Sequence, residues 1–456
     1  MVLDRSVSRC RGVWHTAICL MSLLMFPVCS DQSIAQSISL LSDAEAWQRL
    51  PETTSGGNQP LPSWARAVAV HMPRTAAAML QLDYAQRMNS PLPPQLRAKL
   101  RWAVAECNRC EYSMHYAKAD LKRAGGNIDS LANLESLLAS STATEKNAID
   151  FIRQLTTNAP QIPDSLFESL RQDLGEHQAA SLILLGAYGN FQDRIVLGLG
   201  LPMEPNGPLE PLNVEFVPGA IQLAPLVPAS STPSIAATGD PDVIRDESLW
   251  TDLSYQQLQE RLEHQRTRKP RLPVKSWDDV KRNLPESLRQ RPTSIVWNLM
   301  CYGYVPELAI PWTNATRTMW AELPGDRVFE ESLFWIQTRT IECNYCMGHC
   351  EMLLEVAGLN KQEIADRVRR LGSDDWSGFS PPEQRSYAFA RKLTQAPWTL
   401  TPDDYQALEK ELGPAKAMST FWWLCRGLYM TRISDGFQLP LETENVFGGI
   451  PPAKPK

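Results

Sequence analysis

Thiol groups cluster in one short stretch of the chain. Cys343 and Cys346 have C-x-x-C spacing, His349 follows within one helical turn, and Cys350 comes next. The pattern then turns apolar and stops at Gly358, which predicts a helix that carries the thiols in its first turn and ends at a glycine cap. The helix dipole stabilises a thiolate in the first turn, and a C-x-x-C pair can close into a disulfide. The stretch is therefore suited to two-electron redox chemistry.

Metal binding is a second class of chemistry for the same residues. The three cysteines and His349 are all zinc-type ligands, but structural zinc normally draws its ligands from two separate segments. Four ligands so close together on one helix cannot easily close a tetrahedron, so we expect neither a metal nor a cofactor. Attachment of c-type haem needs histidine directly after the second cysteine, where Met347 stands, and is excluded.

The stretch has a counterpart earlier in the chain. Aligning Cys110 with Cys343 without gaps sets Trp102 on Trp335, Tyr112 on Tyr345, Met114 on Met347 and Ala124-Gly125 on Ala357-Gly358. After a small change of offset the match continues with Phe151 on Phe389, Leu155-Thr156 on Leu393-Thr394, Leu174-Gly175 on Leu412-Gly413, Arg194 on Arg432, Leu201-Pro202 on Leu439-Pro440 and Glu204 on Glu442. Identities held over such a length predict two copies of one domain.

Both copies are predicted to be α-helical throughout, because no convincing period-2 strand pattern occurs in either. Apolar residues recur at helical spacing over 148–155, and a helix is predicted to open at 163–165 with Ser165 and Glu168 at capping-box spacing. In the second copy, Thr401 is an N-cap followed by proline and two acids. The Trp-rich run 421–424 is expected in the core or at a dimer-like interface rather than around a cofactor.

The chain has 456 residues, of which 43% are hydrophobic and 21% charged, and a net charge of −6. These values are typical of a soluble globular protein and argue against a nucleic-acid partner. Residues 1–35 have the pattern of a secretory signal peptide, with three arginines before an apolar run and small residues at the end. We expect an exported, periplasmic or extracytoplasmic protein, with an uncleaved anchor as the alternative.

The domain organisation follows from these patterns. We expect a first helical domain over 36–202 and a second over 277–447. A Pro-rich linker over 203–276 separates them, with one short helix from Tyr255 to Gln265, and a disordered tail covers 448–456.

The cysteines do not form a disulfide scaffold. Seven of them lie after residue 35, an odd number spread over a long chain. Cys301 and Cys425 stand among apolar residues and are expected to be buried.

A helical domain with this Cys-x-Tyr-Cys stretch, a histidine and an Ala-Gly after it and an acid before it resembles the carboxymuconolactone decarboxylase and alkylhydroperoxidase D-like family. Leu61-Pro-Ser-Trp-Ala-Arg66 resembles the family's approach to its first helices. The resemblance implies an all-α fold in which two fused alkylhydroperoxidase D-like domains form a pseudo-dimer, with homo-oligomers through helical surfaces. It also implies an antioxidant thiol peroxidase or disulfide oxidoreductase that acts on a hydroperoxide and is reduced by an external dithiol.

The resemblance assigns residue roles in the second copy. Glu331 stands where the family's peroxidase branch places its glutamate, Cys346 would attack the substrate, Cys343 would resolve the product, and Glu331 with His349 would relay the proton. One unbroken helix would set Glu331 and His349 about 27 Å apart. A helix break is therefore predicted near 340–344.

The sequence departs from the family pattern at the histidine. The pattern expects histidine where Cys350 stands, and His349 comes one residue early, which turns a side chain by about 100° around a helix. Cys350 is then a third redox thiol or a small packed side chain.

The first copy is degenerate. Ser113 takes the place of the second cysteine, Ala98 that of the glutamate, and His115 is displaced. Cys107 and Cys110 form a C-x-x-C of their own, which is an alternative redox pair, a structural disulfide or a relic. We expect a non-catalytic copy that fills the dimer-like interface.

Two other functions remain open. The family's lactone decarboxylases are lyases that rely on a pocket histidine, whereas the C-x-x-C pair here favours the redox branch. A non-catalytic secreted scaffold with a structural Cys343–Cys346 disulfide is the second alternative, and thiol reactivity distinguishes it from an enzyme.

Overall fold

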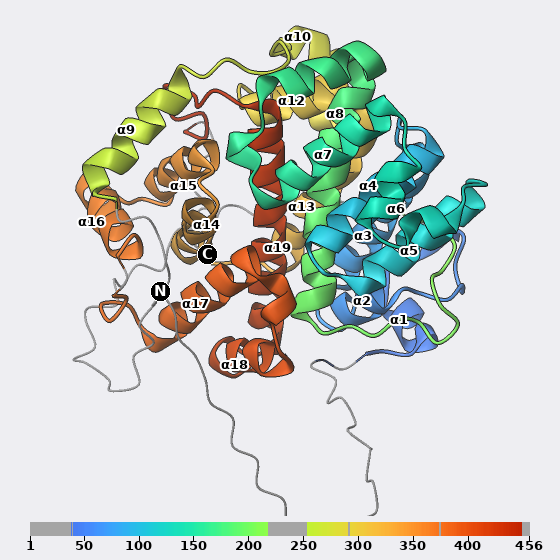
Figure 1. Cartoon of the computed structure of the whole chain (residues 1–456). Coiled ribbons are helices and arrows are strands. Elements are labelled where there is room, and N and C mark those ends of the chain that lie inside the picture. The colour runs from blue at the N-terminus through green and yellow to red at the C-terminus, as the bar shows by residue number, and fades with distance from the viewer. Residues whose placement is uncertain (1–37, 39, 218–252, 291, 374, 449–456) are drawn as a thin grey trace, which may run out of the picture. The chain divides into compact units, whose positions relative to one another are not determined.

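Helices make up nearly all regular structure in the computed structural model, which describes residues 38, 40–217, 253–290, 292–373 and 375–448 (Figure 1). The predicted all-α class is confirmed. One small exception is an antiparallel pair of strands, β1 (Thr53–Ser55) and β2 (Glu215–Phe216). Both are too short to show an alternating pattern of apolar and polar residues in the sequence. The predicted signal peptide, residues 218–252 of the predicted linker and residues 449–456 of the predicted tail lie outside the described residues.

The helices before the linker are α1 (Asp43–Arg49), α2 (Ser63–Val68), α3 (Pro73–Tyr84), α4 (Pro94–Cys107), α5 (Glu111–Arg123), α6 (Leu134–Ala139), α7 (Ala143–Thr157) and α8 (Asp164–Gly198). Those after it are α9 (Tyr255–Arg266), α10 (Trp277–Val280), α11 (Glu286–Arg289), α12 (Val296–Tyr304), α13 (Pro306–Glu322), α14 (Arg327–Thr340), α15 (Asn344–Val356), α16 (Lys361–Leu371), α17 (Pro381–Gln395), α18 (Pro402–Leu412) and α19 (Pro414–Phe437). Short 3₁₀ turns follow α5 (Ile128–Leu131), α7 (Ala159–Gln161), α10 (Lys281–Asn283) and α17 (Pro397–Thr399), and a π-helical turn (Ala85–Asn89) continues α3.

The core is centred on α8 and α19, which pack along one another (Figure 1). Helices α4 and α7 cover α8, while α14, α15 and α18 pack against α19, and α3 packs against α13. The Trp-rich run lies in this core as expected: Trp422 stacks on Trp312 with ring centroids 6.2 Å apart and meets the Phe191 ring edge-on at 5.5 Å. The two longest apolar helices thus hold the two halves of the chain together.

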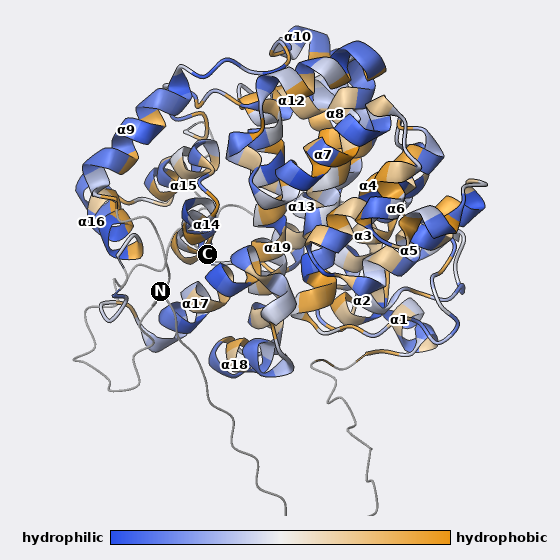
Figure 2. Cartoon of the chain, viewed as in Figure 1, coloured by the Kyte–Doolittle hydropathy of each residue, from blue (hydrophilic) through white to orange (hydrophobic). Residues whose placement is uncertain are grey.

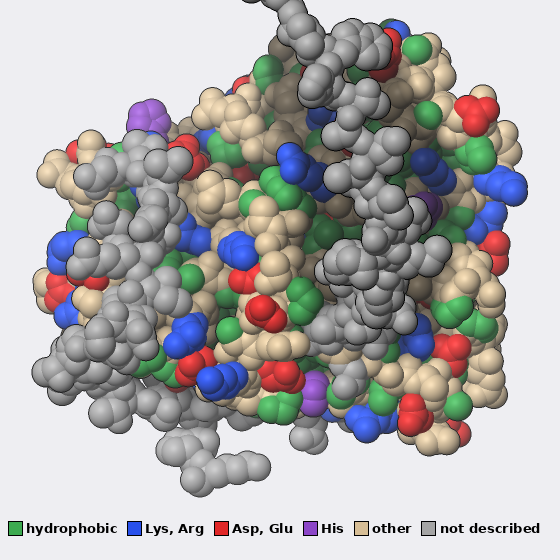
Figure 3. All heavy atoms as spheres, turned by 60° about the horizontal axis from the view of Figure 1, so that its bottom comes forward, with side chains coloured by type: hydrophobic (Ala, Val, Ile, Leu, Met, Phe, Trp, Pro, Cys, Tyr) green, Lys and Arg blue, Asp and Glu red, His purple; other side chains and the backbone are tan. Residues whose placement is uncertain are grey.

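The outer helices are more polar than the central ones. Figure 2 shows α9 and α16 largely hydrophilic, whereas the inner sides of α4 and α7 are hydrophobic. On the face in Figure 3, acidic and basic side chains are interspersed and do not gather by sign. Within the described ranges, no helix combines the length and the apolar character needed to cross a bilayer.

The predicted helix starts at 163–165, Thr401 and Tyr255 are confirmed, and one predicted cap was wrong. Thr401 forms the predicted N-cap of α18, with a reciprocal capping box, and α9 begins at Tyr255 and ends one residue beyond the predicted end. The predicted cap at Ser165 was wrong, because α8 begins at Asp164 with Pro163 as its N-cap and no side-chain cap bond. The Asp164 carboxylate binds Arg271 instead.

Two glycines set the direction of the central helices. Gly175 bends α8 with φ 77° and ψ 164°, and Gly413 separates α18 from α19 with φ 76° and ψ 156°. These positive φ values are in a region that only glycine adopts at low cost. Both turns redirect the chain into the long apolar segment that reaches the core.

Candidate active site

The predicted helix break is confirmed and positions the thiols. Helix α14 ends at Thr340 and α15 begins at Asn344. Between them Glu342 has a left-handed backbone with φ 60°, and the Cys343 amide donates to the Thr338 carbonyl at 2.9 Å. This is the hydrogen-bonding pattern of a Schellman helix end, formed without glycine. The turn leaves Cys343 as the N-cap residue of α15.

The three cysteines of the motif lie on the buried side of α15. Cys343 and Cys350 are fully buried and Cys346 is 2% exposed, and all three are free thiols. The Cys343 and Cys346 thiols are within hydrogen-bonding reach of each other, and the Cys346 sulfur lies 3.2 Å from the Ser434 hydroxyl. The pair is therefore close enough to exchange protons, and its two sulfurs are neighbours.

Glu331 reaches the thiol cluster, but at Cys350. Its fully buried carboxyl group accepts a hydrogen bond from Arg327 Nη1 at 3.0 Å and contacts the Cys350 thiol. Burial raises the pKa of Glu331, and the Arg327 charge acts against that rise. Burial and then the Glu331 charge raise the pKa of Cys350 well above its ordinary value. Cys350 therefore lies between the acid and the C-x-x-C pair.

His349 points to a different partner. Its Nε2 lies 2.7 Å from Oε2 of Glu442, and its ring packs against those of Tyr345 and Phe447. A carboxylate can only accept, so the ring must donate from Nε2. Among the described residues neither His349 nor Glu331 hydrogen-bonds to Cys346, although both were expected to relay its proton.

The Glu442 carboxylate joins three hydrogen-bond partners and was not assigned to the site from the sequence. Its Oε1 accepts from the Val296 amide at 2.7 Å and from the Tyr345 hydroxyl at 3.1 Å. Burial alone would raise the pKa of Glu442, but the hydrogen bond and charge of His349 bring it below the ordinary value. The match of Glu204 with Glu442 was the sequence signal that marked this position.

Two buried arginines of α19 flank the thiol pair. Arg426 and Arg432 are both near enough to Cys346 for their charges to act on it. Burial lowers the pKa of each arginine to about 10, so both stay cationic at neutral pH. Two guanidinium groups therefore lie near the Cys346 sulfur. Only Arg432 had a sequence signal, through its match with Arg194.

Asp435 is a buried acid beside Cys343, and its charge acts on the thiol. The thiol itself lies 3.9 Å from the Thr431 carbonyl, and Asp435 Oδ2 has no hydrogen-bond partner among the described residues. Burial raises the pKa of Asp435 to about 7, even though Arg432 and Arg268 act in the opposite direction. A carboxyl group with such a pKa can accept and return a proton at neutral pH. No sequence motif pointed to this residue.

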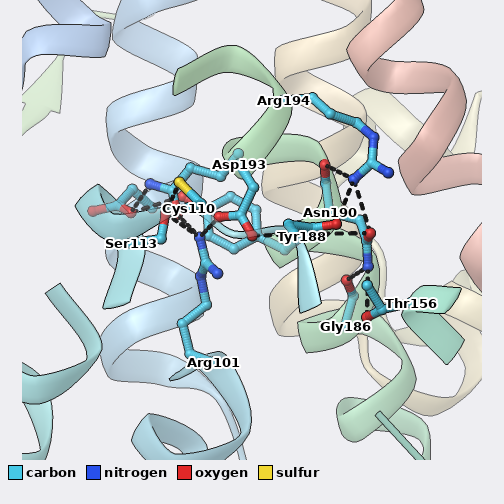
Figure 4. Close-up of polar contacts among 12 residues, drawn as sticks. Arg101, Cys110, Ser113, Thr156, Gly186, Tyr188, Asn190, Asp193 and Arg194 are labelled. Carbon is cyan, nitrogen blue, oxygen red and sulfur yellow. Dashed lines mark hydrogen bonds and ion pairs between the residues drawn. The ribbon is translucent and has the colours of Figure 1, made fainter. Parts of the chain in front are cut away.

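In the first half, a different set of polar contacts surrounds Cys110 (Figure 4). The Cys110 thiol donates to the Ser113 hydroxyl at 3.4 Å, and Arg101 donates to the same hydroxyl at 2.8 Å. Arg101 also forms an ion pair with Asp193. Burial raises the pKa of Cys110 to about 12. The Cys110 thiol is thus next to a hydroxyl rather than a second thiol.

The remaining candidates of the first half do not join this cluster. Cys107 is half-buried beside the Glu106 carboxylate, its sulfur 3.9 Å from Oε2, and burial raises its pKa to about 11. His115 is exposed, and its Nδ1 contacts the Glu111 carbonyl of its own helix at 3.0 Å. The structure therefore does not bring His115 to either thiol.

Comparisons with known proteins do not assign a function to this site. Neither the comparison with protein-family models nor that with curated proteins gave a match. Within the described ranges, no three His, Cys, Asp or Glu side chains are grouped as a metal ion would require. The function must therefore be argued from the thiol cluster itself.

Two buried acids predict an unusual dependence of stability on pH. Burial raises the pKa of both Glu330 and Asp435 to about 7. Between their ordinary values and that pH, the folded chain holds protons that the unfolded chain has released, so stability falls as pH rises. We expect the free energy of unfolding in urea to be a few kcal/mol larger at about pH 5.5 than at about pH 8. A Glu330→Gln, Asp435→Asn double variant should make this slope shallower, while Glu351, whose pKa burial also raises to about 7, keeps part of it. An unchanged slope would contradict the assignment.

Proposed function

We propose that the chain is a dithiol–disulfide oxidoreductase of the alkylhydroperoxidase D-like type, which reduces hydroperoxides through Cys346 and Cys343. The observation that carries the proposal is the pair of neighbouring free thiols at the start of α15, flanked by two buried arginines and one carboxyl group. Cationic neighbours and a helix N-terminus both favour a thiolate. The predicted export signal would place this chemistry outside the cytoplasm.

We further propose that the fold is a fused pair of equivalent helical domains. Cys110 and Cys343 both follow a non-glycine residue with a left-handed backbone, Arg109 at φ 53° and Glu342 at φ 60°. The bend at Gly175 in α8 has nearly the dihedral angles of the turn at Gly413 between α18 and α19, with φ 77° against 76° and ψ 164° against 156°. Such local agreement is expected when two segments share one fold.

Side-chain contacts support the same equivalence. Glu204 accepts from the Ser63 amide at 2.7 Å and from the Tyr112 hydroxyl at 2.5 Å. Glu442 accepts from a backbone amide and a tyrosine hydroxyl in the same way. Across the centre, Arg194 donates to the Thr394 carbonyl and Arg432 to the Thr156 carbonyl. These reciprocal bonds are what a pseudo-dimer interface would contain.

The proposed reaction has two steps on the protein. The Cys346 thiol first releases its proton, and the thiolate attacks one peroxide oxygen, so that an S–O bond forms and the O–O bond breaks. The leaving alkoxide takes up the released proton and becomes an alcohol. The Cys343 sulfur then attacks the sulfenic acid on Cys346, forming the disulfide and expelling hydroxide, which leaves as water. An external dithiol then returns two electrons and two protons.

We propose a different proton relay from the one that the resemblance implied. His349 is bound to Glu442, and Glu331 meets Cys350, so the proton acceptor in the second step is assigned to Asp435, which contacts Cys343. Neither Glu331 nor Cys350 is given a proton-transfer role at Cys346. The proposed reaction therefore uses two thiols and Asp435 rather than a glutamate–histidine pair.

A coupled assay tests the proposal. Purified protein is given an organic hydroperoxide and a regenerating dithiol, and peroxide loss is followed with time. Turnover that depends on both substrates supports the proposal. A rate no higher than that of protein-free buffer with the same dithiol would remove it.

Replacing Asp435 by asparagine should impair the second step selectively. An amide cannot accept the Cys343 proton, so disulfide closure should slow by about a hundredfold and lose its pH dependence near neutrality. The first step should keep its rate, and a sulfenic-acid trapping reagent should therefore label Cys346 in the variant but not in the wild type. Closure with the wild-type pH profile would show that Asp435 is not the acceptor.

Burial of both sulfurs favours a second candidate, a structural disulfide in a non-catalytic protein. Cys343 is 0% and Cys346 2% exposed, and buried cysteines are usually inert. A cross-link that closes once would resist reducing agents under native conditions and would never return to the dithiol. Rapid alkylation of reduced, folded protein at Cys346 would support the enzyme, whereas modification only after unfolding would support the scaffold.

A further inference from the structure

A small cavity lies in the first half of the chain, and Arg101 of Figure 4 forms part of its wall. Its volume is ≈ 30 Å³, which is room for about two water molecules or a ligand of about four heavy atoms. Ala98 and Ala117 form part of its wall. Their short side chains leave space that longer side chains would fill.

Two buried side chains in the cavity wall have polar atoms without a hydrogen-bond partner. Gln86 is 1% exposed, and neither its amide nitrogen nor its amide oxygen has a hydrogen-bond partner. Arg101 uses Nη2 for Ser113, Gln192 and Asp193, but its buried Nη1 has no partner. Buried polar groups of native proteins are rarely left without a partner. Gln86 is also on the π-helical turn after α3, a type of turn that is frequent at functional sites.

The charges around the cavity favour an anion. Arg87 is paired with Asp83 and Asp120. The partly exposed Arg97 also lines the cavity and has no carboxylate partner within the described part of the chain. One guanidinium therefore remains without a counter-charge.

The acids that line the cavity have little capacity left for a ligand. Asp83 Oδ1 already accepts from the Tyr188 hydroxyl at 2.7 Å and from Gln192 at 3.2 Å. Oδ2 of Asp83 and both oxygens of Asp120 accept from Arg87. The unused groups of the wall are therefore mainly donors.

We propose that this cavity binds a small carboxylate or a planar oxyanion of the same size, held by the Gln86 amide, Arg101 Nη1 and the Arg97 guanidinium. A planar anion of about four heavy atoms matches both the volume and the fork geometry of a guanidinium. Arg101 connects the ligand to Ser113 and hence to Cys110, so occupancy would stiffen the start of α5. The proposal does not depend on the redox function, because it involves no thiol chemistry.

Calorimetric titration of the full chain with sodium acetate, at constant ionic strength set with sodium chloride, tests the proposal. We expect saturable binding that Gln86→Leu and the cavity-filling Ala98→Val each weaken by at least about tenfold. Gln95→Leu makes the same chemical change at an exposed position of α4 and should bind as the wild type does. Bicarbonate, the second planar anion, should compete with acetate for the site, and phosphate, which is tetrahedral, should not.

Three results would overturn the inference. The first is the absence of saturable binding of either planar anion to the wild type. The second is acetate affinity unchanged in both Gln86→Leu and Ala98→Val, the latter serving if Gln86→Leu fails to fold. The third is tighter binding of phosphate than of acetate, which would assign the cavity to a tetrahedral ligand.

Discussion

Cys346→Ser should lose hydroperoxide-dependent oxidation by at least about a thousandfold, because a serine hydroxyl cannot replace the attacking thiolate. Stopped-flow measurement of peroxide reduction by the pre-reduced protein gives the rate. Cys343→Ser should keep the first step and stop at the sulfenic acid, since the resolving thiol is absent. The two serine variants therefore separate attack from resolution.

Cys301 provides the control for this comparison. It is fully buried, and nothing but burial raises its pKa, so it has no assigned chemistry. Cys301→Ala should oxidise at the wild-type rate. Equal rates in Cys346→Ser and in the wild type would end the assignment of Cys346, whichever other thiol then proved reactive.

Glu442→Ala should lower the free energy of unfolding by about 3–5 kcal/mol, the usual cost of breaking a buried charge pair. The His349 and Glu442 side chains are each 9% exposed, and the carboxylate also holds the Val296 amide and the Tyr345 hydroxyl. Its removal leaves an amide, a hydroxyl and a ring nitrogen without an acceptor. Urea unfolding near neutral pH measures the change.

A neighbouring glutamate gives the matched control. Glu444 is exposed and two positions away, so Glu444→Ala should change stability by less than about 0.5 kcal/mol. The stability that depends on charged Glu442 is present above the ordinary glutamate pKa and is lost as pH falls through the lowered one. The difference between wild type and Glu442→Ala should therefore shrink at acidic pH. A loss in Glu442→Ala no larger than in Glu444→Ala would show that the Glu442 carboxylate does not stabilise the fold.

Local features of the fold were predictable from the sequence because they depend on nearby residues. The apolar spacing over 148–155 lies in α7, and Gly358 ends α15 with φ 104°. The break between α14 and α15 was predicted because one continuous helix would have held Glu331 and His349 far apart. In each case the signal and the structure lie within a few turns of chain.

The site was harder to predict because its members meet across long sequence separations. The contact of Asp435 with Cys343 depends on how α19 packs against α15, and no motif records that packing. The turn at Glu342 adopts a left-handed backbone without the glycine that would have announced it. His349 was assigned to the proton relay from the sequence, and its contact with Glu442 is visible only in the structure.

The most direct measurement is the mass of the protein after anaerobic reduction and addition of one equivalent of hydroperoxide. The account predicts a loss of two hydrogens, mapped by peptide analysis to a bridge between Cys343 and Cys346 and reversed by a dithiol. An unchanged mass, or oxidation that maps to other cysteines while these two stay reduced, would contradict it.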